Sequence, residues 1–97
     1  MKNQQGDQIR VYMPRHGEVI GEIEELLGGS RFKIRCQDGH TRVCRMPGRI
    51  RYRMKIQPGD NAVIKPWDIQ PTEKGDIVRV YTRTQANFLK KKGIIKG

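Results

Sequence analysis

The sequence has no long apolar run and few aromatic residues. No segment approaches the roughly 18 apolar residues of a membrane-spanning helix, and residues 2–7 are polar where a signal peptide would be apolar. We therefore expect a soluble, cytoplasmic protein that does not enter a membrane. A chain of 97 residues has room for one small domain with a single core, so its length excludes a second domain and the long insertions of many enzymes.

Residues that carry catalysis are also scarce. Ser30 is the one serine, no glycine-rich motif of the phosphate-binding kind is present, and no pair of carboxylates stands out as catalytic. Because the groups that catalysis and cofactor binding need are missing, the sequence predicts that the protein is not an enzyme and has no cofactor.

What the chain has in excess is positive charge. Twenty Lys and Arg stand against ten Asp and Glu, a formal net charge of +10, which indicates a polyanionic partner such as RNA, DNA or an acidic membrane surface. Residues 41–57 contain six basic residues and no acidic one. Folding does not require so many like charges, which repel one another, and this stretch therefore predicts an RNA-binding surface. Its basic residues are Arg42, Arg45, Arg49, Arg51, Arg53 and Lys55.

Two turn signals predict a three-stranded meander. Gly28-Gly29 and Asp38-Gly39 are both typical of two-residue hairpin turns, and each fixes a register. The first turn pairs Ile23 with Ile34, Glu22 with Arg35 and Glu24 with Lys33; the second pairs Ile34 with Val43, Cys36 with Thr41 and Arg35 with Arg42.

The register from the second turn would point Arg45 toward the core. We therefore expect a bulge or the end of the third strand at this residue.

The outer face of the meander predicts how RNA binds. Arg35 directly opposite Arg42 is an unfavourable pair for an isolated sheet. Phe32, the one aromatic residue on the second and third strands, points inward in this register, so base stacking is not the expected mode. Arginines without an aromatic platform suit phosphates and the shape of folded RNA. His40 at the turn is left open between a base contact and a solvated turn residue.

The two cysteines flank His40 at a spacing that resembles a zinc site. The predicted register places Cys36 and Cys44 on opposite faces of the sheet, and only His16 offers itself as a fourth ligand. We therefore predict no metal site. The same argument disfavours a disulfide between the two thiols.

The rest of the chain completes a barrel. Residues 48–56 have the character of a turn or short helix, and Asn61–Lys65 and Asp76–Arg83 are predicted to be the fourth and fifth strands. Five short strands with an insertion between the third and fourth predict an all-β, five-stranded barrel of the oligonucleotide/oligosaccharide-binding (OB) fold. Trp67, after the fourth strand, is expected to be a plug at the barrel end rather than an exposed stacking residue, because burial removes its large apolar area from water.

The barrel has a short extension at each end. Residues 1–16 have few apolar side chains and predict a flexible basic arm before the OB-fold domain, which we place at residues 17–83. Residues 84–97 predict a short C-terminal helix and tail. Thr84 is the expected cap of this helix, and Gly93 the expected stop.

Several short motifs are not explained by the general needs of a barrel. The Pro-Gly-Arg after the third strand and the Lys-Pro-Trp-Asp that closes the fourth are the most distinctive. Through these motifs, from Gly17 to about Arg83, the chain closely resembles archaeal translation initiation factor 1A. The segments that carry the resemblance are Met13-Pro14-Arg15-His16-Gly17-Glu18-Val19, Arg35-Cys36-Gln37-Asp38-Gly39, Arg45-Met46-Pro47-Gly48-Arg49, and Gly59-Asp60 followed by Val63-Ile64-Lys65-Pro66-Trp67-Asp68.

The resemblance implies a barrel that binds the aminoacyl-tRNA site of the small ribosomal subunit through 16S rRNA and assists start-site selection and subunit joining, without chemistry. One alternative is a general RNA chaperone of the cold-shock type, against which the missing outward aromatic residues count. Another is a permanent ribosomal structural protein, which the sequence does not separate from a factor. The resemblance assigns the RNA-binding role to Arg35, His40, Arg42, Arg45, Arg49, Arg51, Arg53 and Lys55.

The resemblance also implies partners. We expect a monomer that works with other initiation factors, including the 5B GTPase. The chain ends soon after the barrel, without the long acidic tail of the eukaryotic relatives. Ile94 and Ile95 are therefore the apolar candidates for contact with that GTPase.

Overall fold

The computed structural model describes residues 11–48 and 56–96. Arg49, Arg51, Arg53 and Lys55, with the turn or short helix predicted around them, lie outside the described residues. The described elements are β1 (Val19–Gly28), β2 (Arg31–Cys36), β3 (Thr41–Arg45), β4 (Asn61–Pro66), β5 (Lys74–Val80) and α2 (Arg83–Lys91).

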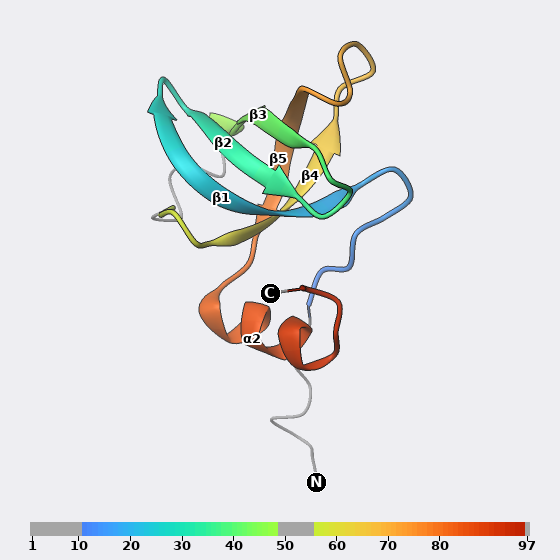
Figure 1. The fold of residues 1–97 in the computed structure, drawn as a ribbon. Helices are drawn as coiled ribbons and strands as arrows, with labels where there is room; N and C mark the ends of the chain where they lie inside the picture. The colour runs from blue at the N-terminus through green and yellow to red at the C-terminus, as the bar shows by residue number, and fades with distance from the viewer. Residues whose placement is uncertain (1–10, 49–55, 97) are drawn as a thin grey trace, which may run out of the picture.

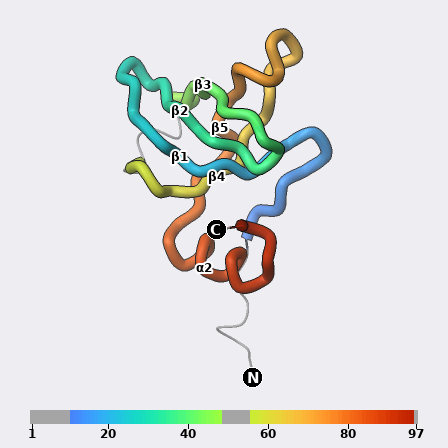
Figure 2. Tube along the Cα trace, viewed as in Figure 1, coloured from blue at the N-terminus to red at the C-terminus, as the bar shows by residue number. Residues whose placement is uncertain are grey.

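The five strands close into a barrel. Their order around it is β1, β2, β3, β5 and β4, and β4 pairs back onto β1. The seam between β3 and β5 is parallel and short, whereas the other seams are antiparallel. Figure 1 and the tube of Figure 2 show α2 below the barrel, beside the first described residues of the chain. The predicted all-β, five-stranded barrel with a short C-terminal helix is confirmed.

The core of the barrel follows from alternation along the strands. In β2, Phe32, Ile34 and Cys36 are buried and the residues between them are exposed, because successive side chains of a strand point to opposite faces. Ile64 of β4 and Ile77 of β5 are fully buried in the same cluster. Burial of each such aliphatic side chain contributes about 1.5–3 kcal/mol relative to exposure.

Gly21 and Gly75 allow strands to approach inside the barrel. A Cβ atom on Gly21 would lie 2.5 Å from Cγ2 of Ile34, and one on Gly75 would lie 2.7 Å from Cγ2 of Ile64. Both distances are well below van der Waals contact, so the interior has no room for a methyl group at either place. Close packing of the barrel interior therefore requires glycine at these two positions.

The tip of the β1–β2 hairpin lies one residue later than predicted. Gly28 pairs with Arg31, so the turn residues are Gly29 and Ser30, with φ of +58° and +64°, as a type I′ turn requires. Two register shifts within β1 offset this displacement. The pairs of Ile23 with Ile34 and Glu22 with Arg35 are confirmed, whereas Lys33 pairs with Glu25 and the predicted pair of Lys33 with Glu24 was wrong.

The β2–β3 turn holds one residue more than predicted. Gly39 has a φ of +96°, its N–H donates to the carbonyl of Cys36 at 3.1 Å, and the N–H of Cys36 donates to the carbonyl of His40 at 2.9 Å. This is a three-residue loop with a left-handed glycine, a common alternative to the two-residue turn. The added residue shifts the register by one, and such a slip turns every side chain of β3 to the other face.

The shifted register corrects the predicted faces of β3. Arg42 and Cys44 are buried, with exposed fractions of 3% and 0%, whereas Val43 and Arg45 face outward. The strand ends at Arg45, as expected, but no bulge is needed, because alternation in the true register already turns Arg45 to solvent. The observed pairs are Ile34 with Arg42 and Arg35 with Thr41, in place of the predicted pairs Ile34 with Val43, Cys36 with Thr41 and Arg35 with Arg42.

The C-terminal helix α2 is capped earlier than predicted. Thr82, and not Thr84, is the N-cap: its hydroxyl accepts from the N–H of Gln85, and the Gln85 side chain accepts from the N–H of Thr82. Gly93, with a φ of +77°, follows the C-cap Lys92 and ends the helix, as predicted. Among the described residues, no helix is long and apolar enough to cross a membrane.

A second apolar cluster joins α2 to the barrel. Leu89 of α2 and Ile95 beyond it are buried in one cluster with Ile20 of β1, Val63 of β4 and Tyr81. Leu89 and Ile95 therefore both pack on the barrel. The partly buried residues packed on this cluster are Val11, Tyr12, Val78, Phe88 and Ile94.

Part of the predicted N-terminal arm lies against the barrel. Of residues 1–16 the structure describes 11–16. The hydroxyl of Tyr12 donates to the carboxylate of Glu18 at 3.0 Å, and its carbonyl accepts from the hydroxyl of Tyr81. The guanidinium of Arg79 lies 4.6 Å from the centre of the Tyr12 ring. These contacts attach the described part of the arm to the barrel.

We expect Gly21→Ala to lower the free energy of unfolding by about 1–3 kcal/mol, because the added methyl group would press on Ile34. Gly48→Ala is the matched control: a Cβ atom there meets nothing within 4 Å, and we expect a change below about 0.5 kcal/mol. Urea denaturation of both variants measures the difference. Equal stability of the two variants would contradict the packing role.

Candidate nucleic-acid interface

The outer face of β2 and β3 carries a group of positive charges. β2 contributes Arg31, Lys33 and Arg35, and β3 contributes Arg45, all four exposed. We call these four residues the basic strand face. At about 3.3 Å per residue, the three β2 side chains extend over roughly 13 Å. Arg35 and Arg45 were predicted as RNA-binding residues, and the structure brings them together with Arg31 and Lys33.

A like-charge pair lies within this face. Arg31 is directly opposite Arg45 in the β2–β3 ladder, and facing charges of one sign destabilise an isolated pair of strands. Within residues 11–48 and 56–96, neither Arg31 nor Lys33 has an ion-pair partner. The arrangement therefore favours an anionic ligand that neutralises these side chains.

The carboxylate partners of the other two arginines are held loosely. Arg35 lies 3.7 Å from the carboxylates of Glu22 and Glu24, and Arg45 lies 3.7 Å from that of Asp76. The two arginine side chains remain 63% and 64% exposed, and exposed pairs of this kind contribute about 0–1 kcal/mol. A phosphate can therefore replace these carboxylates with little loss of stability.

Trp67 lies at the edge of the basic strand face, beside Arg45. Its indole N–H donates to Asp76 at 3.0 Å, and the guanidinium of Arg45 lies 5.6 Å from the centre of its ring. The ring is half-buried. Trp67 is thus neither a buried plug nor a free stacking platform, because one face of the ring supports an arginine.

His40 is exposed at the β2–β3 turn. Its backbone N–H donates to the carboxylate of Asp38 at 3.2 Å, and its carbonyl accepts from Cys36. Because these hydrogen bonds use only the backbone of His40, the imidazole of His40 remains on the surface. The turn adjoins Arg35, which pairs with Thr41, so His40 extends the basic strand face at one end.

Arg42, predicted to face RNA, lies inside the structure. Its Nε donates to the carbonyl of Pro71 at 2.6 Å, and its Nη1 and Nη2 donate to the two carboxylate oxygens of Asp38 at 3.0 and 2.7 Å. The hydrogen bonds from Arg42 hold the pKa of Asp38 below its usual value, and the same bonds raise the pKa of Arg42. Arg42 therefore stays charged and fully engaged with protein groups.

The two cysteines lie in one core. The prediction that Cys36 and Cys44 point to opposite faces was wrong, since both are buried as free thiols in the barrel interior. Burial raises the pKa of Cys44 to about 12 and also raises the pKa of Cys36, which leaves both thiols protonated and unreactive at neutral pH. In the part of the chain that the structure describes, no three His, Cys, Asp or Glu side chains gather as a metal site.

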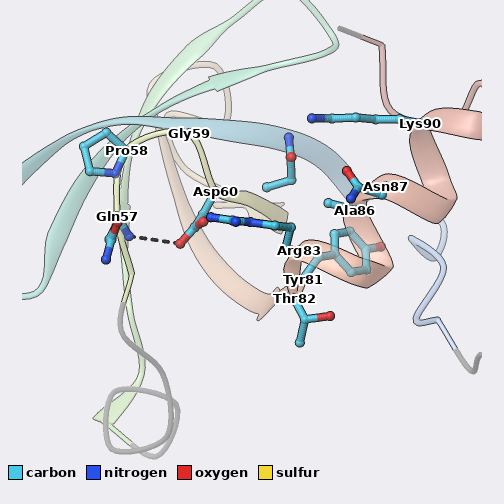
Figure 3. A pocket seen from close by; sticks show the side chains of 11 residues that line it. Gln57, Pro58, Gly59, Asp60, Tyr81, Thr82, Arg83, Ala86, Asn87 and Lys90 are labelled. Atoms are coloured by element: carbon cyan, nitrogen blue, oxygen red, sulfur yellow. Dashed lines mark hydrogen bonds between the residues drawn. The ribbon is translucent and has the colours of Figure 1, made fainter.

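A polar cleft of about 300 Å³ separates the Gln57–Asn61 segment from α2. Figure 3 shows Arg83 and Lys90 extending from α2 across this cleft, and Asp60, whose carboxylate accepts from the N–H of Gln57 at 3.0 Å, on the other wall. Nothing in the sequence predicts the cleft, because its walls come from separate segments that only the fold brings together.

The fold and this face define a class of protein, a small OB-fold barrel with a basic outer face on two adjacent strands. The sequence model of the family described as Translation initiation factor 1A / IF-1 matches residues 8–97. The chain belongs to this family. Its place in protein biosynthesis, with RNA and ribosome binding, follows from that membership.

Several archaeal proteins are similar to the chain. Translation initiation factor 1A of Methanothermobacter thermautotrophicus is 47% identical over 87 residues, which cover 90% of this chain and 88% of that protein. The factor of the same name from Methanococcus aeolicus is 40% identical over 96 residues, which cover 99% and 91% of the two chains. The resemblance to archaeal factor 1A is confirmed.

Two solved structures share the fold. Translation initiation factor IF-1 from the wolbachia endosymbiont strain TRS of Brugia malayi has a TM-score of 0.51 and 25% identity, and the match covers 74% of this chain and 85% of that one. YjeQ from Thermotoga maritima has a TM-score of 0.56 and 22% identity over 68% of this chain and 23% of that one. The second likeness shows the fold alone, and the first confirms the OB fold predicted from the sequence.

We expect the two sides of the Arg42–Asp38 pair to differ in their effect on stability. Asp38→Ala leaves a buried guanidinium without its counter-ion and should cost roughly 3 kcal/mol. Arg42→Met leaves a carboxylate that is 31% exposed and can hydrate, so the destabilisation should be only about 1–2 kcal/mol. Chemical denaturation of both variants measures the difference, and a larger destabilisation by Arg42→Met would show that the buried charge is not the dominant factor.

We expect the free energy of unfolding to decrease as the pH falls through the lowered pKa of Asp38. In the unfolded chain this carboxyl has a pKa of about 3.9, so below that pH the unfolded state binds more protons than the folded one. The contribution is complete above about pH 4 and is lost in stronger acid. Asp38→Asn has no carboxyl to titrate and should show a shallower decline; identical acid unfolding curves would rule out this linkage.

Proposed function

We propose that the protein binds the aminoacyl-tRNA site of the small ribosomal subunit through 16S rRNA and assists start-site selection and subunit joining. The observation that carries the proposal is the exposed pair of Arg31 opposite Arg45, in a chain of the initiation factor 1A family. The repulsion within this pair is relieved when phosphates lie against the strand face. Binding to rRNA therefore removes a repulsion that destabilises the free protein.

The basic strand face recognises phosphates and RNA shape rather than single bases. The outward positions of β2 and β3 that are not basic hold Thr41 and Val43, and Phe32 is buried. A cold-shock type of chaperone stacks bases on outward aromatic rings, and no such ring occupies the outward positions of β2 and β3. Folded rRNA, with its closely spaced phosphates, suits this face better than single-stranded RNA.

The proposed RNA-binding residues extend beyond the strand face. His40 and Arg35 lie at one end of it, and Arg31 and Arg45 at the other. Arg42 is omitted as a contact, since its donors are taken by Asp38 and Pro71. On the grounds of sequence, the interface continues along the chain after Arg45 with Arg49, Arg51, Arg53 and Lys55.

The protein acts as a monomer by occupying its site, without catalysis, and works with other initiation factors that include the 5B GTPase. Ile94 and Ile95 offer little surface for the contact with that GTPase. Ile95 is only 3% exposed and Ile94 is partly buried on the same cluster, so their apolar surface is used within the protein.

We expect Arg31→Gln combined with Arg45→Gln to weaken binding to purified small ribosomal subunits. Every phosphate that a variant no longer neutralises reduces the slope of log K against log salt by about 0.7–0.9, so the double variant should lose about 1.4–1.8 units of slope and at least roughly tenfold in affinity. Lys91→Gln combined with Lys92→Gln removes the same charge from the end of α2 and serves as the control. Equal losses in the two double variants would show an effect of net charge alone.

Chemical footprinting of 16S rRNA tests where on the small subunit the protein binds. The wild-type protein should protect nucleotides of the decoding region, and the Arg31 and Arg45 double variant should lose that protection at the same protein concentration. Protection confined to another region of 16S rRNA would overturn the proposed site, whatever the affinity.

A further inference from the structure

Arg42 is a buried charge whose position needs an explanation. Its guanidinium reaches two loops, with Nε on Pro71 of the β4–β5 loop and both terminal nitrogens on Asp38 of the β2–β3 turn. We call these three residues the Arg42 clamp. A buried ion pair is a weak source of stability, and its best-attested use is to select one geometry among several. The clamp therefore indicates that the relative position of the two loops matters.

One side of the clamp is rigid. In the β4–β5 loop, the N–H groups of Glu73 and Lys74 both donate to the carbonyl of Gln70, at 3.0 and 2.9 Å. Gln70 itself has a φ of +61°, a conformation that a residue with a side chain adopts only where its surroundings fix it. The carbonyl of Pro71, the next residue, is thus a fixed anchor for Arg42.

The clamp continues the seam that closes the barrel. Parallel pairing of β3 with β5 begins at Val43 and Lys74, and the N–H of Val43 donates to the carbonyl of Glu73 at 2.9 Å. Arg42 is the residue just before Val43, where backbone pairing between the two strands ends. Its side chain therefore takes over the connection that the backbone no longer makes.

The other side of the clamp carries a residue of the proposed interface. The Asp38 oxygen that receives Nη1 of Arg42 also accepts from the backbone N–H of His40, at 3.2 Å. The place of His40 thus depends on Asp38, and that of Asp38 on Arg42. Because Thr41 pairs with Arg35, the same turn forms the end of the basic strand face.

We propose that Arg42 is a positioning residue for RNA binding, which touches no RNA and fixes the His40 turn in the geometry that binds. This inference rests on the proposed binding to rRNA. A turn held in place before binding loses less conformational freedom on binding than a mobile one. The clamp thus connects the closed seam of the barrel to one end of its RNA-binding face.

The salt dependence of binding separates a positioning arginine from a contacting one. Arg42→Met should weaken binding to purified small ribosomal subunits about three- to tenfold at 0.1 M salt and leave the slope of log K against log salt unchanged, because no phosphate contact is removed. Arg45→Met is the matched comparison and should lower the slope by about 0.7–0.9. A similar fall in slope for Arg42→Met would overturn the proposal.

A double-mutant cycle tests the route through His40. His40→Ala should weaken binding in the wild-type background and have little further effect in Arg42→Met, since the turn is then no longer held in place. In the Arg45→Met background the effect of His40→Ala should remain close to its wild-type size. Equal losses from His40→Ala in all three backgrounds would overturn the coupling.

Two measurements keep the test independent of misfolding and of the proposed function. Amide hydrogen exchange of Arg42→Met should speed up in residues 37–40 while the core strands stay protected; loss of protection throughout would contradict a local role. Arg42→Lys keeps the positive charge but lacks the planar guanidinium that reaches both loops, so it should bind small subunits as weakly as Arg42→Met. Wild-type affinity of Arg42→Lys would also overturn the proposal. If the wild-type protein itself fails to bind small subunits, the proposed function fails, and only the exchange result then bears on the clamp.

Discussion

The length of the β2–β3 turn determines which side chains of β3 meet solvent. A residue with a Cβ atom resists a φ of +96°, and glycine at position 39 allows the turn to hold three residues. Since one residue fixes the facing of all others in a strand, this turn length places Cys44 in the core, Arg42 beneath the turn and Arg45 in solvent. The distribution of charge over the surface thus follows from the length of one turn.

The fold uses the guanidinium group in two ways, and geometry separates them. Arg42 has three hydrogen bonds of 2.6–3.0 Å and is buried, so that it cannot leave its partners without stranding a charge in a poorly hydrated place. Arg35 and Arg45 sit 3.7 Å from their carboxylates in solvent, where such pairs contribute about 0–1 kcal/mol. Only the second kind is free to exchange a carboxylate for a phosphate.

Much of this could be predicted from the sequence, because it depends on local patterns. The pairing of Ile23 with Ile34 follows from matching apolar residues, and it survives a misplaced turn because bulges in β1 restore the register. The facing of Arg42 could not be predicted in the same way. Asp38-Gly39 is compatible with a two-residue and a three-residue turn, and the choice depends on how β3 meets β5, which are about 30 residues apart in sequence.

In the candidate site, too, local patterns predict some features and contacts between distant segments determine the others. The exposure of Arg35 and His40 agrees with the sequence-based prediction, because β2 alternates as predicted and turns are exposed in almost any register. The exposure of Arg45 by alternation required the shifted register of β3. The partners of Arg45 required the fold, since Asp76 and Trp67 reach it only across the β3–β5 seam and beyond the end of β4. Contacts across such a seam leave no local pattern in the sequence.

The short parallel seam between β3 and β5 has one buried end and one exposed end. At one end Arg42 joins β3 to the β4–β5 loop from within, and at the other Arg45 meets Asp76 in solvent. A phosphate that takes Arg45 from Asp76 does not leave this carboxylate alone, because the indole N–H of Trp67 still donates to it at 3.0 Å. The exposed end of the seam can therefore change partners while the buried end stays closed, and such an exchange leaves the shape of the basic strand face unchanged.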